Sequence, residues 1–177
     1  MRTKDIDSIT VNEIIERADV SRTTFYRHFT DKFALINWMF GQYMDELTAS
    51  YQGVTTYRLL LIKLLTFFRE KRVFFSKILN YLGQNSFYQY FLDRLTGLLT
   101  TYLQSNMGGG ELSAEDKYML RYHSGGILRV TYDWLGAGTP ESPEELTNIL
   151  LGIASGYQRA YALPFFRDIG TEIQKET

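Results

Sequence analysis

Residues 10–32 read TVNEIIERADVSRTTFYRHFTDK, and the interpretation of the whole chain starts from this stretch. A capping box opens it, because the Thr10 hydroxyl can accept a hydrogen bond from the amide of Glu13 while the Glu13 carboxylate reaches back. Apolar residues then recur at the spacing of one helical face, which predicts a helix over residues 10–18. These apolar residues are Val11, Ile14, Ile15 and Ala18.

A tight turn and a second short helix follow the first. Residues 19–21 predict a three-residue turn, and the next helix is expected over residues 22–29. Phe25 and Phe29 lie four residues apart, so they share a face that can pack on the first helix. The other face is small, polar and basic, an arrangement typical of a helix-turn-helix unit that reads DNA.

The residue types of the second helix suit the chemistry of the major groove. Arginine can donate to guanine or phosphate, and the methyl group of threonine can contact thymine. Hydroxyl and ammonium groups near the helix N-termini are placed to hold phosphates. The candidate DNA-binding residues are Thr10, Ser21, Arg22, Thr23, Thr24, Tyr26, Arg27, His28 and Lys32.

Residues 9–35 resemble the DNA-binding segment of the TetR family of bacterial transcriptional regulators. The family pattern reads T-V-x-x-I-A-x-x-A-G-V-S-x-x-T-x-Y-x-Y-F-x-x-K-x-x-L. The chain departs from it mildly, with Ile15 for a small residue, Asp19 for glycine, Phe25 for leucine and His28 for tyrosine. Aspartate tolerates the left-handed backbone that glycine adopts in such a turn.

In the TetR family a further helix precedes this segment and braces it. Only residues 1–8 stand before the matched segment here, so we expect a head from which that first helix is largely missing. The resemblance implies two domains. The first is a DNA-binding head with its connecting helix, over residues 1–50, and the second is a ligand-sensing and dimerisation domain over residues 51–177.

Capping residues and glycine breakers divide the remaining chain into further helices. Start signals recur at Thr30, Ser113 and Ser142, and Pro143 suits the first position of a helix. No alternating apolar and polar run between hairpin turns predicts a strand. We therefore expect an all-α fold with helices at about 10–18, 22–29, 31–50, 54–69, 71–82, 85–106, 113–136 and 142–163.

The last two helices carry features of a dimer interface. Residues 132–146 resemble the C-terminal portion of one TetR subgroup, in which the two final long helices pair with those of a second copy. Glycine inside a helix costs up to about 1 kcal/mol relative to alanine, and close approach of a neighbouring helix would explain it. A monomeric core with incidental glycines is the alternative. The candidate interface residues are Gly125, Gly126, Leu146, Ile149, Ile153, Gly156 and Tyr157.

The three helices between residues 54 and 106 are rich in phenylalanine and tyrosine. Such rings can simply fill a core. Alternatively, some of them line a pocket for a small ligand, apolar with a few hydroxyl groups. The candidate lining residues are Tyr88, Tyr118, Tyr122, His123 and Trp134.

Composition and motifs exclude several classes of protein. The 177 residues carry a net charge of −1 and contain no cysteine, which removes disulfides and thiolate metal sites and suits a reducing cytoplasm. The most apolar run, residues 59–68, is far shorter than the ~20 residues that a bilayer requires, and no secretory signal opens the chain. Neither His28 nor His123 belongs to a catalytic or metal-binding motif, so no enzyme activity, cofactor or metal is expected.

The residues and the resemblance together predict a dimeric TetR-type transcriptional regulator in the cytoplasm. Two recognition helices related by a twofold axis would read a palindromic operator in double-stranded DNA. A small molecule or a protein would act as effector. The alternatives are a dimeric helical sensor or interaction protein that has lost DNA binding, and an enzyme whose turnover would depend on His123.

Overall fold

The computed structural model describes residues 8–49, 57–81, 83, 86–106 and 110–155, and these fold into eight helices with no strand among them. The expected all-α fold is confirmed, and each expected helix has a counterpart. The helices are α1 (Val11–Ala18), α2 (Arg22–His28), α3 (Lys32–Ala49), α4 (Tyr57–Glu70), α5 (Arg72–Ile78), α6 (Phe87–Asn106), α7 (Ala114–Gly136) and α8 (Pro143–Ser155). The expected end of the last helix, residues 156–163, lies outside the described residues.

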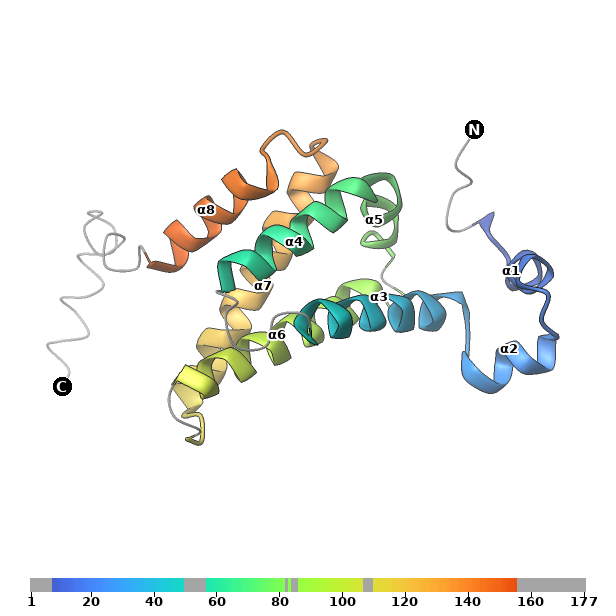
Figure 1. The fold of residues 1–177 in the computed structure, drawn as a ribbon, viewed down its shortest axis with the longest axis horizontal. Coiled ribbons are helices and arrows are strands. Elements are labelled where there is room, and N and C mark those ends of the chain that lie inside the picture. The colour runs from blue at the N-terminus through green and yellow to red at the C-terminus, as the bar shows by residue number, and fades with distance from the viewer. Residues whose placement is uncertain (1–7, 50–56, 82, 84–85, 107–109, 156–177) are drawn as a thin grey trace, which may run out of the picture.

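The short helices α1 and α2 form a head at one end of the molecule, and α3 leads from this head into the body (Figure 1). In the body α4 packs against α8 and α6 packs against α7, while α3 lies along α6. The first two helices therefore touch the body mainly through α3.

Side-chain caps explain where several helices begin. The capping boxes of Thr10 with Glu13 and of Ser113 with Asp116 are both formed, the first as the sequence predicts. Hydrogen bonds from Ser113 lower the pKa of Asp116, because they favour the charged carboxylate. The sequence predicts that α3 begins at residue 31, after a cap at Thr30. In the structure Asp31 is the cap, because its carboxylate accepts a hydrogen bond from the Ala34 amide at 2.7 Å, and the helix begins at Lys32.

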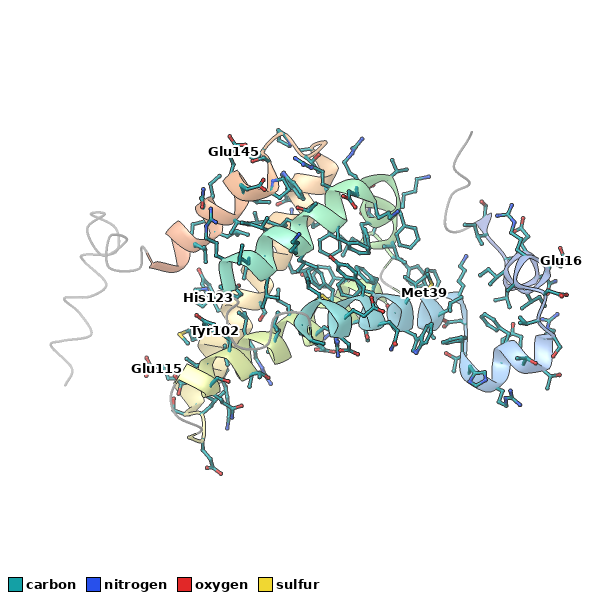
Figure 2. All side chains as sticks on the ribbon, in the orientation of Figure 1. Glu16, Met39, Tyr102, Glu115, His123 and Glu145 are labelled. Carbon is teal, nitrogen blue, oxygen red and sulfur yellow. The ribbon has the colours of Figure 1, made fainter. Side chains whose placement is uncertain are left out.

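An aromatic core holds the body together and anchors α3 in it. Phe40 of α3 lies among rings from three other helices, at 4.9 Å from the centroid of Phe87 and 5.8 Å from that of Phe68. Phe68, Phe87 and Phe91 are fully buried. Figure 2 shows aromatic side chains concentrated between α3 and α4. For these rings the simpler interpretation, that they fill a core, is confirmed.

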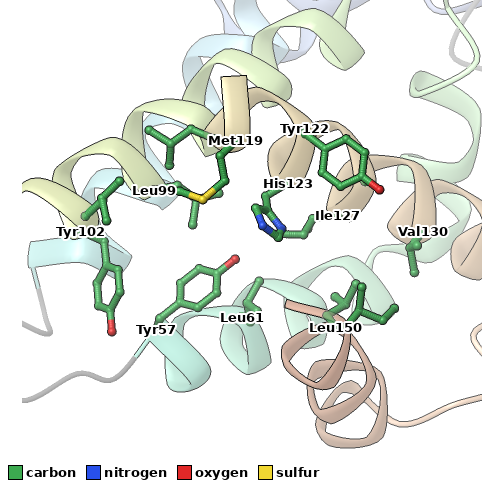
Figure 3. A pocket seen from close by; sticks show the side chains of 14 residues that line it. Tyr57, Leu61, Leu99, Tyr102, Met119, Tyr122, His123, Ile127, Val130 and Leu150 are labelled. Carbon is green, nitrogen blue, oxygen red and sulfur yellow. The ribbon is translucent and has the colours of Figure 1, made fainter. Parts of the chain in front are cut away.

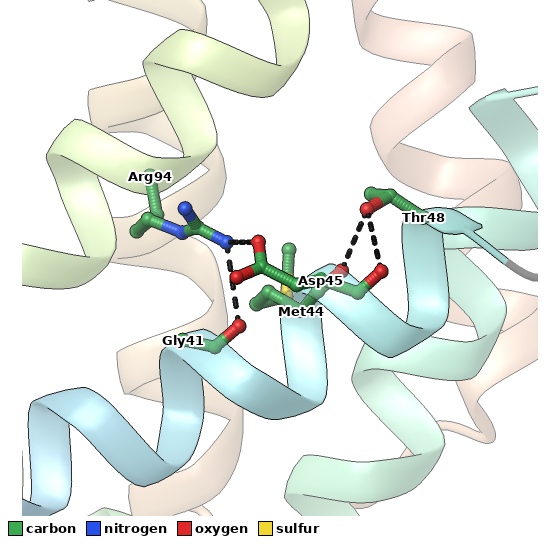
Figure 4. Close-up of polar contacts among 5 residues, drawn as sticks. All are labelled: Gly41, Met44, Asp45, Thr48 and Arg94. Atoms are coloured by element: carbon green, nitrogen blue, oxygen red, sulfur yellow. Dashed lines mark hydrogen bonds and ion pairs between the residues drawn. The ribbon is translucent and has the colours of Figure 1, made fainter.

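A polar contact adds to this attachment of α3 on its outer side. The Arg94 guanidinium of α6 forms an ion pair with the Asp45 carboxylate and donates to the carbonyl of Gly41 at 3.4 Å (Figure 4). Gly41 is buried, and the hydroxyl of Tyr90 occupies the space that a Cβ atom at this position would need. Glycine thus lets α3 and α6 approach closely.

Truncating a ring in this core should destabilise the protein strongly. Phe91→Ala leaves a cavity at a fully buried position, and we expect a loss of about 3–5 kcal/mol in the free energy of unfolding. Denaturant unfolding followed by circular dichroism measures it. Val73→Ala at an exposed position is the control, with an expected change within about 0.5 kcal/mol. Equal effects of the two variants would contradict this description of the core.

Candidate nucleic-acid interface

The turn between α1 and α2 is tight because Asp19 adopts the left-handed conformation. Its backbone has φ 52° and ψ 46°, and its amide donates to the carbonyl groups of Glu16 and Ile15. The Val20 amide also donates to Ile15, at 3.1 Å. Aspartate here takes the backbone conformation that glycine has in the TetR pattern, as the sequence predicts.

A side-chain cap and a set of aromatic contacts fix α2 in place. Ser21 caps it, because the Ser21 hydroxyl accepts a hydrogen bond from the Thr24 amide at 3.0 Å. On the inner face Phe25 is buried, and its ring centroid lies 5.7 Å from that of Phe29. Phe29 in turn lies 5.7 Å from Trp38 of α3, so the short helix is held against the start of the connecting helix.

Most of the candidate DNA-binding side chains are exposed on the outer face of this head. The Arg22 guanidinium lies 5.6 Å from the centre of the Tyr26 ring and donates to the side chain of Asn12 at 3.4 Å. Arg27 approaches the ring of His28 at 3.5 Å. The exposed candidates are Thr10, Ser21, Arg22, Thr23, Tyr26, Arg27 and His28.

Two candidates, Thr24 and Lys32, are half-buried and have internal contacts. The Thr24 hydroxyl lies 2.8 Å from that of Ser21. The Lys32 ammonium donates to the carbonyl of Ile9 at 2.9 Å and lies 5.2 Å from the centre of the Phe33 ring. Lys32 therefore ties the segment before α1 to the start of α3. An ammonium has three donors, so this bond does not use its full capacity.

Residues 21–32 carry a local positive charge. Arg22, Arg27 and Lys32 stand against the single carboxylate of Asp31 in this stretch. The whole chain has a net charge of −1, so the positive excess here is a local property of the stretch and does not reflect the total. Phosphate attraction depends on such local charge rather than on the total.

In the body the candidate pocket residues are scattered. Tyr122 and His123 line a cavity of about 270 Å³ between α4, α6, α7 and α8, and the other three do not. Trp134 is buried and donates to the carbonyl of Glu141 at 3.1 Å, while Tyr118 is exposed and Tyr88 packs at the edge of the core. Tyr57 and Tyr102 also line the cavity. The sequence does not predict this, because nothing in their spacing distinguishes them from the other tyrosines of the chain.

Four of the candidate interface residues lie on α7 and α8 outside the buried core, namely Gly125, Gly126, Ile149 and Ile153. Ile149 and Ile153 are large apolar side chains left 48% and 58% exposed. A Cβ atom added at Gly125 or Gly126 would meet nothing within 4 Å. Leu146 instead belongs to the chain's own core. The remaining two, Gly156 and Tyr157, lie outside the described residues.

Comparison with known proteins identifies the family. The family model for bacterial regulatory proteins of the tetR family matches residues 1–38, and that for a transcriptional regulator C-terminal region, TetR_C_8, matches residues 56–156. The chain belongs to the TetR family. Its matched regions and its relatives are those of transcriptional regulators and not of enzymes, as the sequence predicts.

Two curated relatives and one solved structure place the chain within the family. It is 24% identical over 158 residues to the dhaKLM operon transcriptional activator DhaS of Lactococcus lactis, covering 85% of this chain and 82% of DhaS. It is 26% identical over 191 residues to the regulator YxbF of Bacillus subtilis, and it spans 47% of that protein. The solved structure of the dihydroxyacetone kinase operon activator DhaS shares the fold, with a TM-score of 0.61, 23% identity and 85% of both chains covered.

Neither a membrane span nor a metal site accompanies these features in the structure. Of the helices described, none has the length and apolarity that a bilayer crossing requires. Within the same residues, no group of histidine and carboxylate side chains is arranged to hold a metal ion.

Removing the cap of α2 should loosen that helix without unfolding the body. Ser21→Ala deletes the acceptor of the Thr24 amide, and such caps contribute about 1 kcal/mol. Hydrogen exchange at the Thr24 amide should therefore quicken roughly fivefold. Thr23→Ala is the control, because it leaves both atoms of the cap in place, and equal exchange in the two variants would show that the cap is not formed.

Proposed function

We propose that this TetR-family chain binds a palindromic operator as a homodimer, with α2 of each copy in the major groove. The observation that carries this proposal is the construction of α2, whose inner face is fixed by Phe25 and whose outer face is polar, basic and exposed. A recognition helix needs both properties, because base contacts require side chains that are free to donate and a backbone that does not move. The proposed division is a head over residues 1–50 and a sensing and dimerisation domain over residues 51–177.

The exposed face divides into base-reading and phosphate-holding groups. Arg22 and Thr23 stand in the first turn of α2, the part of a recognition helix that reaches base edges. Thr10 and Lys32 flank the helix starts of α1 and α3, where hydroxyl, ammonium and backbone donors can meet phosphates together. Ser21, Thr24, Tyr26, Arg27 and His28 complete the proposed DNA-binding set.

Fluorescence anisotropy on the DNA that flanks the chain's own gene tests the proposal. Binding should be tighter than to scrambled DNA of equal length and should weaken as salt rises, because bound phosphates release counterions. Weak binding that is equal on both DNAs would contradict operator recognition. That outcome would favour the alternative of a helical sensor that has lost DNA binding.

Substitutions should separate the two kinds of contact. Arg22→Ala should cost about 1–3 kcal/mol of operator affinity and relax the preference at the base pair it contacts. Lys32→Gln, which keeps a donor for the Ile9 carbonyl but removes the charge, should weaken binding to all sequences and lower the salt slope by about one unit. Arg69→Ala, at the exposed end of α4, is the control. An unchanged salt slope in Lys32→Gln would refute the phosphate contact.

The proposed homodimer interface is the exposed apolar surface of α7 and α8. Large apolar side chains are exposed on both helices, namely Tyr118 and Tyr122 of α7, both more than two thirds exposed, and Ile149 and Ile153 of α8. Tyr122 and Ile153 border the same cavity, and exposed apolar side chains near one another mark an association site. The glycines of α7, with open space beside them, would let a helix of the second copy approach closely.

A charge in this face should separate the copies. Ile149→Arg would bury an unpaired guanidinium in the proposed interface, which costs about 3–5 kcal/mol, so the chain should become monomeric in light scattering. Operator affinity should fall with it, because two linked heads are required. Leu59→Arg, at a comparably exposed position on α4, should leave the dimer intact. A monomeric parent chain would refute the dimer outright.

Control of DNA binding by an effector would act through α3. This helix carries the head, and its attachment to the body includes the packing of Phe40, the stacking of Tyr43 on Phe67 and the contact of Arg94 with Asp45 and Gly41. An effector that binds one orientation of α3 better than another shifts the population toward that orientation. We further propose that the protein acts in the cytoplasm, where its operator lies.

A further inference from the structure

The cavity between α4, α6, α7 and α8 has the properties of a binding site for a small molecule. Its walls are mainly aliphatic, with Leu61, Leu99, Ile127 and Leu150 facing it from the four helices (Figure 3). Its volume of about 270 Å³ lies just below the usual range of roughly 300–1,000 Å³ for ligand pockets. An occupant would therefore be apolar and modest in size.

Tyr57 gives this cavity a polar group that lacks a partner. Its hydroxyl is buried, and no atom of the described residues forms a hydrogen bond with it. Figure 3 shows the hydroxyl pointing toward the middle of the cavity, on the side where the His123 ring lies. Burial raises the pKa of Tyr57 above its ordinary value, and the neighbouring Tyr102 raises it further, so the group stays a neutral donor.

A buried hydroxyl without a partner is unfavourable, and an acceptor on a bound molecule would remove that cost. The lining holds no lysine, arginine or carboxylate, and its polar groups are tyrosine hydroxyls and the imidazole of His123, so the complementary ligand is uncharged. It would carry one hydrogen-bond acceptor, such as a ketone or ester oxygen, on an aromatic or alkyl frame.

One side of the cavity is formed by the proposed dimer face. Met119, Tyr122 and Ile153 line the cavity and are also among the exposed large apolar residues of the chain. Gly126, which lines it too, has open space where a Cβ atom would lie. The described residues of a single copy therefore leave this side open, and in the proposed dimer the second copy would cover it.

We propose that this cavity binds a small, uncharged, mostly apolar molecule with one hydrogen-bond acceptor for Tyr57, and that a second copy of the chain closes the site. The proposal rests on the homodimer described above and extends it. Because the site is complete only in the dimer, ligand binding and dimerisation strengthen each other by the same factor. The ligand thereby acts on the association of two heads and so on operator binding.

Acdan, a fluorescent naphthyl ketone, is a suitable probe because it is neutral, compact and has one acceptor. Its emission moves to the blue in an apolar site and to the red when the ketone accepts a hydrogen bond. Titrated into the full chain, it should bind saturably with blue-shifted emission. Tyr57→Phe should bind it roughly two- to tenfold more weakly and shift the emission further to the blue.

Three further variants separate the site from general effects on folding. Tyr88→Phe removes a tyrosine hydroxyl outside the cavity and should leave binding unchanged. Leu103→Trp adds bulk to the lining and should abolish binding. Ile149 is not a lining residue of the cavity. Because Ile149→Arg should prevent dimerisation, it should weaken acdan binding at least about tenfold. In the parent chain, acdan should lower the dimer dissociation constant in sedimentation equilibrium.

The outcomes distinguish this inference from the function it extends. Absence of saturable binding, or equal binding by the parent, Tyr57→Phe and Leu103→Trp, would overturn the site while leaving the dimer and operator binding intact. Undiminished binding by a monomeric Ile149→Arg would overturn closure by the second copy. A parent chain that is monomeric with and without acdan would refute both the dimer and this proposal. Variants that lose the helical circular dichroism of the parent are replaced by Val130→Phe, another lining position expected to block the cavity.

Discussion

The packing of Phe40 against the rings of Phe68, Phe87 and Phe91 is the interaction on which the rest of the structure depends. It fixes the middle of α3 in the body, and the N-terminal end of α3 joins the head. Aromatic rings suit this position because they bury a large area and pack edge to face in few arrangements. The orientation of α2 relative to the body is thereby defined by one helix with a rigid base.

Several residues of the head that we propose to contact DNA also hold the head together. Thr10 and Ser21 cap α1 and α2, and Lys32 ties the segment before α1 to α3. The same groups face the side proposed for phosphates. Within the described residues of α1 and α2, only Phe25 is buried, so this pair of helices relies on such hydrogen bonds more than a large domain does.

The head and the helix order follow from local sequence, whereas the cavity does not. Caps and apolar spacing depend on residues three or four apart, so Thr10, Asp19 and Phe25 are predicted with their roles. Which tyrosine lines a cavity depends on helices distant in sequence. Trp134 packs into the core, where the carbonyl of Glu141 accepts its indole N–H, and Tyr57 faces the cavity because α6 and α7 pass opposite it. The helix α3 begins one residue later than the sequence predicts, because Thr30 and Asp31 are both capping residues and only the folded chain selects between them.

The length of α3 turns small rotations into large displacements at the DNA. Lys32, where α3 begins, lies eight residues before Phe40, which is about 12 Å at 1.5 Å per residue, and the packing of Phe40 is the base of this lever. A tilt of about 5° at that base moves Lys32 by about 1 Å and moves the more distant α2 further. Donor–acceptor distances in hydrogen bonds vary by only about 0.5 Å, so such a tilt exceeds what the proposed base contacts tolerate. A rigid base is therefore what keeps the proposed recognition helix aligned with the DNA.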